Sequence, residues 1–183
     1  MLLAFAPFVA FAVLNHFISP TAALAIAALI SLGLIGREIV LGHSAKILEV
    51  GTCILFGGLA VYAYLSNANW PIVGVKLAVD IGLLAIVLFS LVVGRPFTIQ
   101  YARETVPRDL WDSPQFLRTN QVITLVWLAA FAAIIVADLI LLFRPDVPHK
   151  LSVLLTIGAL YAAFKFTEAY PDRAEPRATD KPN

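Results

Sequence analysis

The first 36 residues, MLLAFAPFVAFAVLNHFISPTAALAIAALISLGLIG (residues 1–36), contain no Asp, Glu, Lys or Arg. One membrane-spanning helix takes about 20 residues, because a helix rises about 1.5 Å per residue and the hydrocarbon core is about 30 Å thick. The stretch is therefore too long for one span and just long enough for two short spans. Asn15 and His16 interrupt it, and Pro20 favours the first turn of a new helix. We expect helices over residues 2–18 and 20–36.

A cleaved signal peptide is an alternative interpretation of the same stretch. Residues 21–25, TAALA, loosely resemble a cleavage site. However, no Lys or Arg precedes the apolar run, and a second apolar run follows at once. Signal peptides have a positively charged start and a single short apolar segment, so two membrane helices are the better interpretation.

More apolar stretches follow, separated by the turn-forming sequences SNANWP (residues 66–71) and RPDVP (residues 144–148). Backbone groups in lipid must be paired within the protein, and continuous rather than alternating apolar runs favour helices over a barrel. We therefore expect an all-α, polytopic transmembrane bundle of six helices within residues 1–170. The four further helices are expected over residues 47–66, 72–94, 119–143 and 149–168, with an inner loop over 95–118 and a disordered, Pro-rich and charged tail over 171–183.

The composition of the whole chain supports this class. The chain has 183 residues, of which 60% are hydrophobic and 14% are charged, and its mean hydropathy is +0.87. Soluble domains are roughly 25% charged, so an ordinary water-soluble domain and a disordered chain are both excluded. The formal net charge of +1 provides no basic field for nucleic acid, and we expect no nucleic-acid partner.

Lys and Arg residues are distributed unequally between the two sides of a six-helix arrangement. Such an arrangement places both termini and the 95–118 loop on one side, which carries ten of the 13 Lys and Arg residues. The other side carries Lys76, Arg144 and Lys150. Cytoplasmic loops are enriched in Lys and Arg, so we expect both termini in the cytoplasm, with Trp70 at the outer interface and Trp111 at the inner one.

Aromatic residues alternate with arginines in the inner loop. We interpret the loop as a segment on the inner membrane surface, with its rings in the headgroup layer and its arginines at the phosphates of anionic lipids. The candidate lipid or partner contacts are Arg95, Arg103, Arg108 and Trp111. The alternative is that these arginines only fix the topology, which the positive-inside rule explains by itself.

Three charged residues fall inside the predicted spans: Lys76, Asp80 and Asp138. Lys76 and Asp80 are four residues apart on one helix face, and Asp80 and Asp138 lie at about the same depth from the outer side. An unpaired charge in lipid costs several kcal/mol, so we expect these groups to face inward, with Lys76 between the carboxylates and Asn15 or His16 nearby. The sequence therefore predicts either a polar pocket open to the outside or a charge cluster that fixes helix packing.

No pattern in the sequence indicates catalysis, a metal or a cofactor. Cys53 is the single cysteine, and His16, His43 and His149 fall in separate loops without metal-ligand spacing. The sequence contains no phosphate-binding glycine motif and no combination of nucleophile, base and acid. We expect no catalytic residue, no metal ligand and no cofactor, and a protein that is not an enzyme.

Several short segments, taken in order, resemble the bacterial septation protein A family of small inner-membrane proteins. The segments are FAPFVAFAVLN (residues 5–15), PTAALAIAA (20–28), LFGGL (55–59), NWPI (69–72) and GRP (94–96), followed by Glu104, Pro107, Trp111, Asn120 and Trp127. The resemblance covers most of the chain up to about Asp138 and places it in this family or a sister group. The inner loop is longer here, and the last helix and tail depart from the family pattern.

The resemblance implies a multi-pass protein of the bacterial inner membrane with a non-enzymatic role in cell-envelope biogenesis, septation or cell division. Its partners would be the lipid bilayer, including anionic headgroups, and envelope or division proteins for which it acts as a scaffold. The alternative is a small carrier or binder of a lipid or another small molecule in the outer polar pocket. A scaffold predicts a bundle packed throughout, whereas a carrier predicts a cavity that reaches Asp80 or Asp138.

Overall fold

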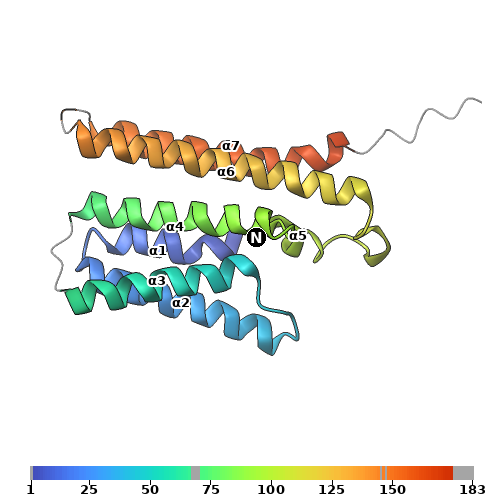
Figure 1. Ribbon diagram of the computed structural model, residues 1–183, viewed down its shortest axis with the longest axis horizontal. Coiled ribbons are helices and arrows are strands. Elements are labelled where there is room, and N and C mark those ends of the chain that lie inside the picture. The colour runs from blue at the N-terminus through green and yellow to red at the C-terminus, as the bar shows by residue number, and fades with distance from the viewer. Residues whose placement is uncertain (1, 67–70, 145, 147, 175–183) are drawn as a thin grey trace, which may run out of the picture.

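The computed structural model describes residues 2–66, 71–144, 146 and 148–174, which form helices joined by short connections (Figure 1). The prediction of an all-α fold is confirmed, since these residues contain no strand. In chain order the elements, with η for a 3-10 helix, are η1 (Leu2–Phe5), α1 (Ala6–Leu14), α2 (Pro20–Val40), α3 (Ile47–Ser66), α4 (Ile72–Val92), α5 (Phe97–Ala102), η2 (Arg108–Leu110), α6 (Pro114–Phe143) and α7 (His149–Ala174).

Five of these helices, α2, α3, α4, α6 and α7, are long and apolar enough to cross a membrane. The sixth predicted span, over residues 2–18, is shorter than expected. Pro7 lies in the first turn of α1, so the preceding residues form η1 instead, and the helix ends before Asn15. The nine residues of α1 extend about 14 Å, which is less than half of the hydrocarbon core.

The structure corrects several other predicted boundaries. α2 continues to Val40, and α6 begins at Pro114 because the Ser113 hydroxyl caps it by accepting a hydrogen bond from the Phe116 N–H at 3.2 Å. The predicted inner loop over 95–118 therefore contains α5, η2 and the first turn of α6. Residues 171–174 of the predicted disordered tail are helical, because α7 continues past Pro171. Pro171 lacks an N–H and removes one backbone hydrogen bond, but the helix tolerates this loss near its end. The rest of that tail lies outside the described residues.

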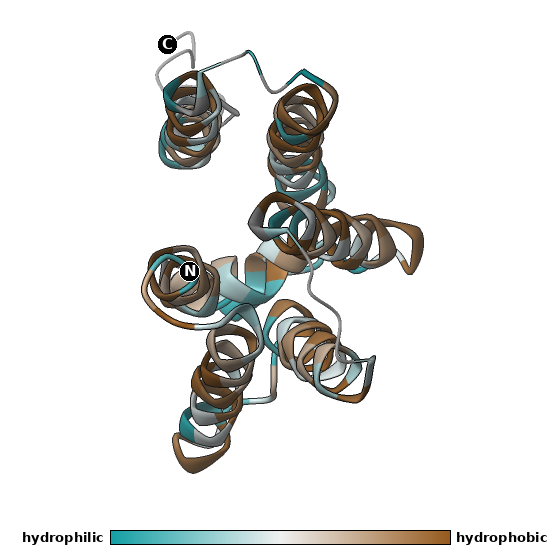
Figure 2. Ribbon diagram, turned by 90° about the vertical axis from the view of Figure 1, so that its left-hand side faces the viewer, coloured by the Kyte–Doolittle hydropathy of each residue, from teal (hydrophilic) through white to brown (hydrophobic). Residues whose placement is uncertain are grey.

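The helices pack mainly against their neighbours in the chain: α1 with α2, α2 with α3, α3 with α4, and α6 with α7. α4 also packs against α6, which joins the two parts of the bundle. α1 begins and α7 ends toward the same end of the bundle (Figure 1). Seen along the helix axes, the long helices are coloured largely as hydrophobic (Figure 2). Many of their large apolar side chains are exposed, as expected for a surface in contact with lipid.

Two glycines let α3 and α4 approach closely. A Cβ atom built on Gly82 of α4 would overlap the side chain of Leu55 on α3, and one on Gly51 of α3 would overlap Ile86 on α4. Small residues at such positions allow van der Waals contact between helix backbones, which drives helix association in membranes.

Gly82→Ala should therefore lower the free energy of unfolding by about 1–3 kcal/mol, the usual effect of overpacking. Gly57→Ala is the matched control, because nothing lies within 4 Å of a Cβ atom at Gly57. It should leave stability unchanged or raise it, since alanine favours a helix. Unfolding in mixed micelles of increasing dodecyl sulfate content measures both, and equal stability of the two variants would contradict the close packing.

Candidate ligand-binding site

Lys76, Asp80 and Asp138, which the sequence placed inside the spans, lie together at one end of the bundle. Lys76 and Asp80 are one turn apart on α4, and Asp138 is on the facing helix, α6. The Lys76 Nζ atom lies 2.9 Å from Asp80 Oδ2 and 2.7 and 2.6 Å from the Oδ1 and Oδ2 atoms of Asp138. Lys76 thus lies between the two carboxylates, the arrangement expected from their equal depth. We call these three residues the Lys76 triad.

The Lys76 triad contains more acidic than basic side chains. Two carboxylates face one ammonium group, whose hydrogen-bond donors all point to carboxylate oxygens. The Asp138 side chain is 1% exposed, and the Ser152 hydroxyl on α7 donates a hydrogen bond to it at 3.4 Å. Such a buried charge requires a partner. Asp80 is more open, with its side chain 19% exposed.

A cavity of about 840 Å³ begins at the Lys76 triad and extends into the bundle. It is lined by η1, α1, α4, α6 and α7. Asn15 and His16, at the end of α1, line the same polar end, so the structure brings together all five residues predicted for the outer pocket. Their role as a functional pocket stays a prediction.

The other end of the cavity is apolar. Trp127 and Phe131 of α6 line it together with Phe5, Phe8 and Phe164. The rings of Phe5 and Trp127 are stacked, with their centroids 4.9 Å apart, and Trp127 Nε1 donates a hydrogen bond to the Thr167 hydroxyl of α7 at 2.9 Å. Asp138 and Trp127 are eleven residues apart on α6, so the polar and apolar ends are separated by about 16 Å.

Two buried polar atoms on the cavity wall have no hydrogen-bond partner among the described residues. They are the side-chain oxygen of Asn15 on α1 and the hydroxyl of Thr156 on α7. Asn15 as a whole is 6% exposed. A buried polar atom without a partner costs about 1–3 kcal/mol, and a bound group would relieve this cost if the two side chains turned their polar atoms toward the cavity.

α1 and α7 line the cavity from the two parts of the bundle. α7 packs mainly against α6, and α1 mainly against α2, so these two helices face each other across the cavity instead of packing together. They stand apart when the bundle is seen along its axes (Figure 2).

Comparison of the chain with protein-family models, curated proteins and solved structures finds no match. The resemblance to the septation protein A family therefore stays a prediction. Within the described residues, no group of three or more His, Cys, Asp or Glu side chains is placed to hold a metal ion.

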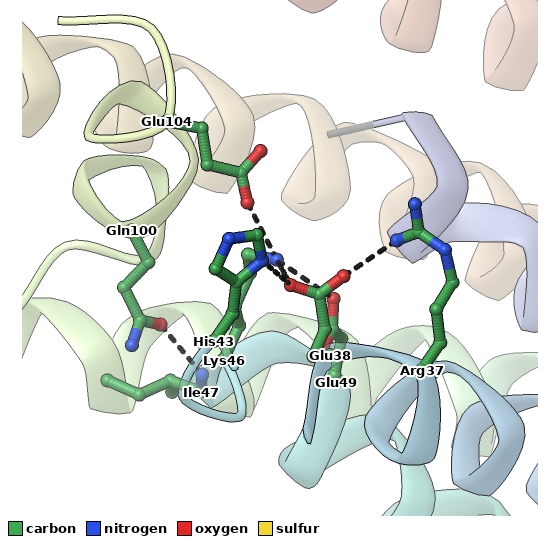
Figure 3. A network of polar contacts seen from close by, with 8 residues as sticks. All are labelled: Arg37, Glu38, His43, Lys46, Ile47, Glu49, Gln100 and Glu104. Carbon is green, nitrogen blue, oxygen red and sulfur yellow. Dashed lines mark hydrogen bonds and ion pairs between the residues drawn. The ribbon is translucent and has the colours of Figure 1, made fainter. Parts of the chain in front are cut away.

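A second polar cluster, which the sequence analysis missed, lies where α2 ends and α3 begins (Figure 3). Lys46, just before α3, is its centre. The Lys46 Nζ atom lies 2.6 Å from Glu38 Oε2, 2.8 Å from Glu104 Oε1 and 3.7 Å from Glu49 Oε1. Arg37 also pairs with Glu38, at 2.8 Å. We call this group the Lys46 cluster.

The electrostatics of the Lys46 cluster are those of a buried ion network. Burial alone would lower the pKa of Lys46, but hydrogen bonds to Glu104 and Glu38 outweigh it and the pKa is raised from its ordinary 10.5. Burial, together with the nearby carboxylates of Glu49, Glu104 and Glu38, raises the pKa of Tyr101. Tyr101 also places its ring 5.1 Å from the Lys46 Nζ atom. A smaller cavity of about 300 Å³ adjoins this cluster.

The four residues predicted for the inner loop do not form one group. Two arginines lie over the Trp111 ring, with the guanidinium carbons of Arg103 and Arg108 at 4.8 and 5.7 Å from its centroid. Trp111 Nε1 donates a hydrogen bond to the Val106 carbonyl at 2.9 Å. Arg95 is exposed at the end of α4 and is not part of this stack.

The expectation that the rings of this loop lie in the headgroup layer is wrong for Phe97 and Tyr101. Both are buried on α5. The Thr98 hydroxyl, which donates a hydrogen bond to the Asn120 carbonyl at 3.0 Å, ties α5 to α6. The helical spacing of α5 turns these rings toward the bundle, whereas a loop would leave them at the surface.

We predict that replacing Arg103 and Arg108 with Gln shifts the emission of Trp111 to longer wavelength and weakens its response to anionic lipid. Each arginine contributes about 1 kcal/mol of attraction to an anionic surface and covers one face of the ring. The measurement is emission in nanodiscs with and without phosphatidylglycerol. Arg95→Gln is the control that spares the stack. A spectrum that is the same in all variants and lipids would show that protein contacts alone hold this segment.

Proposed function

We propose that this multi-pass membrane protein binds an amphiphile, a molecule with a polar head and an apolar chain, in the cavity between α1, α4, α6 and α7. The observation that carries the proposal is the cavity itself, which has charged residues at one end and aromatic residues about 16 Å away. Its volume is within the usual range for small-molecule sites. A structural charge cluster alone would not require such a space.

The separation of α1 and α7 across the cavity supports entry of the ligand from the membrane. An apolar chain in lipid gains little from moving into an apolar protein cavity, because lipid is equally apolar. Binding would then depend on the polar end, where Asp80, Asn15 and Thr156 offer hydrogen-bonding atoms. The proposal corresponds to the alternative of the sequence analysis, a carrier or binder of a lipid or another small molecule. The role as an envelope scaffold stays a prediction from the resemblance.

The proposal is tested by quenching of Trp127 with dodecyl chains that carry bromine at their far end. A protein with Trp70→Phe and Trp111→Phe has Trp127 as its single tryptophan. We expect saturable quenching, because a chain whose head lies at the Lys76 triad places its end near Trp127. If none of the chains, whatever its head group, quenches Trp127 saturably, the proposal is overturned.

Ala12 provides a matched pair of variants. Ala12 on α1 lines the cavity, whereas Val13, the next residue, is 51% exposed and does not line it. Ala12→Phe should fill part of the cavity. The ligand concentration that gives half-maximal quenching of Trp127 should then rise at least tenfold, the effect of losing about 1.4 kcal/mol of binding free energy. Val13→Phe should leave it unchanged. Equal effects of the two variants would place the chain outside the cavity.

We further propose that both termini are cytoplasmic, in the bacterial inner membrane, so that the Lys76 triad lies in the outer half. The unequal distribution of Lys and Arg supports this orientation. A phosphatase reporter fused after Asn183 should be inactive, and one inserted after Trp70 should be active in the periplasm. The opposite pattern would reverse the orientation, and activity at both positions would contradict the three crossings, by α4, α6 and α7, that separate them.

A further inference from the structure

We propose that the head of the bound amphiphile is an amine in its ammonium form, a cation that donates hydrogen bonds. This inference rests on the proposed amphiphile-binding function and adds the chemical class of the ligand. It is carried by the polar end of the cavity, where negative charge exceeds positive charge and the atoms without partners accept hydrogen bonds.

The charge of the Lys76 triad is the first argument. Lys76 donates hydrogen bonds to both carboxylate oxygens of Asp138, so the charges of these two residues nearly cancel. Asp80 shares the same ammonium group through one oxygen and is the more exposed of the two carboxylates. A cationic head beside Asp80 would balance the second carboxylate, since Lys76 is the single Lys or Arg among the described residues that line the cavity. An anionic head would add a charge of the same sign.

The hydrogen-bonding capacity of the wall is the second argument. The donors of Lys76 are directed to carboxylates and are not free to bind a phosphate or carboxylate head. The Asn15 side-chain oxygen only accepts, and the Thr156 hydroxyl can accept, and both lack a partner among the described residues. An ammonium group has N–H donors and no acceptor. It complements these atoms, whereas a quaternary ammonium head has the charge without the donors.

The test uses four terminally brominated dodecyl chains that differ only in the head: the primary amine, the quaternary trimethylammonium, the alcohol and the carboxylate. Their binding is measured by the quenching of Trp127 in nanodiscs whose lipids carry no net charge. We expect the amine to bind about tenfold more tightly than the alcohol, the ratio expected when a charge-assisted hydrogen bond replaces a neutral one. The carboxylate should bind most weakly, and the trimethylammonium head should bind more weakly than the amine.

Two variants locate the effect. Asp80→Asn keeps the Lys76–Asp138 pair intact and should reduce the amine-to-alcohol ratio to about one. Asn15→Leu removes an acceptor oxygen that no described residue uses, so it keeps the fold and should weaken the amine more than the alcohol. Glu168→Gln is the control, because Glu168 pairs with Lys165 on the exposed part of α7, away from the cavity.

The outcomes separate the two proposals. An amine preference that Asp80→Asn removes and Glu168→Gln retains supports the inference. Equal binding of the four heads, a preference for the carboxylate, or an amine preference that survives both Asp80→Asn and Asn15→Leu overturns it, while amphiphile binding still stands. Absence of saturable quenching by all four chains overturns the proposed function itself.

Discussion

Lys76→Met should lower the free energy of unfolding by about 3 kcal/mol. Removing one partner of a buried ion pair costs about 3–5 kcal/mol, because the remaining charge is left uncompensated. The lower end of that range applies here because the Lys76 side chain is 37% exposed. The variant leaves Asp80 and Asp138 facing each other with no cation, and Asp138 is almost fully buried.

Two further variants make this prediction specific. Adding Asp138→Asn to Lys76→Met should restore part of the lost stability, since one carboxylate then remains, at the open end of the cavity. Lys165→Met should leave stability nearly unchanged, although Lys165 has the same 2.9 Å separation from its carboxylate, because that pair is exposed. Unfolding by dodecyl sulfate in mixed micelles measures all three. If Lys76→Met and Lys165→Met are equally stable, the Lys76 triad contributes nothing to folding.

Lys46→Met should have the larger effect, about 3–5 kcal/mol. The Lys46 side chain is 7% exposed, and those of Glu38 and Glu49 are each 6% exposed, so its loss leaves two buried carboxylates, one of them without any cation. Arg37→Met is the matched control. Arg37 contacts Glu38 at 2.8 Å but is 54% exposed, so its removal should cost at most about 1 kcal/mol.

The raised pKa of Lys46 fixes the pH range of its contribution. A lysine whose pKa is raised in the folded state stabilises the fold fully below its unfolded pKa, here 10.5. That stability is lost only as the pH rises through the raised pKa. Between pH 6 and pH 9 titration of Lys46 itself should therefore add no pH dependence to the difference in stability between the natural protein and Lys46→Met. A difference that disappears within this range would show that Lys46 is not the charged centre of its cluster.

The helices and the Lys76 triad could be predicted from the sequence because each follows from local rules. Long apolar runs fix the spans, and α3 has the bounds predicted for it. Lys76 and Asp80 are one turn apart, and the distances of Asp80 and Asp138 from their helix ends set an equal depth. The strong cost of isolated charge in lipid then requires them to meet.

The Lys46 cluster could not be predicted because its members come from three separate segments. Glu38, Lys46 and Glu104 lie near span ends, where charged residues are common and carry little information. Lys46 and Glu49 have helical spacing, the one local signal, but nothing in the chain indicates that Glu38 and Glu104 converge on them. The burial of Phe97 and Tyr101 was missed for a related reason. A six-residue helix between two spans has too little sequence to show its periodicity.

The pairing of Lys76 with Asp80 inside one helix has a consequence for biosynthesis. Asp138 follows Lys76 by 62 residues, and at about 5–20 residues per second the ribosome takes about 3–12 s to make that length of chain. During this time α4 must enter the bilayer without α6. A lone Lys or Asp at the centre of a helix costs about 2.5–3.5 kcal/mol on insertion, but here each charge carries its own counter-charge one turn away. The helix is thus inserted as a nearly neutral segment, and the later arrival of Asp138 makes the site negative only once the bundle has assembled around it.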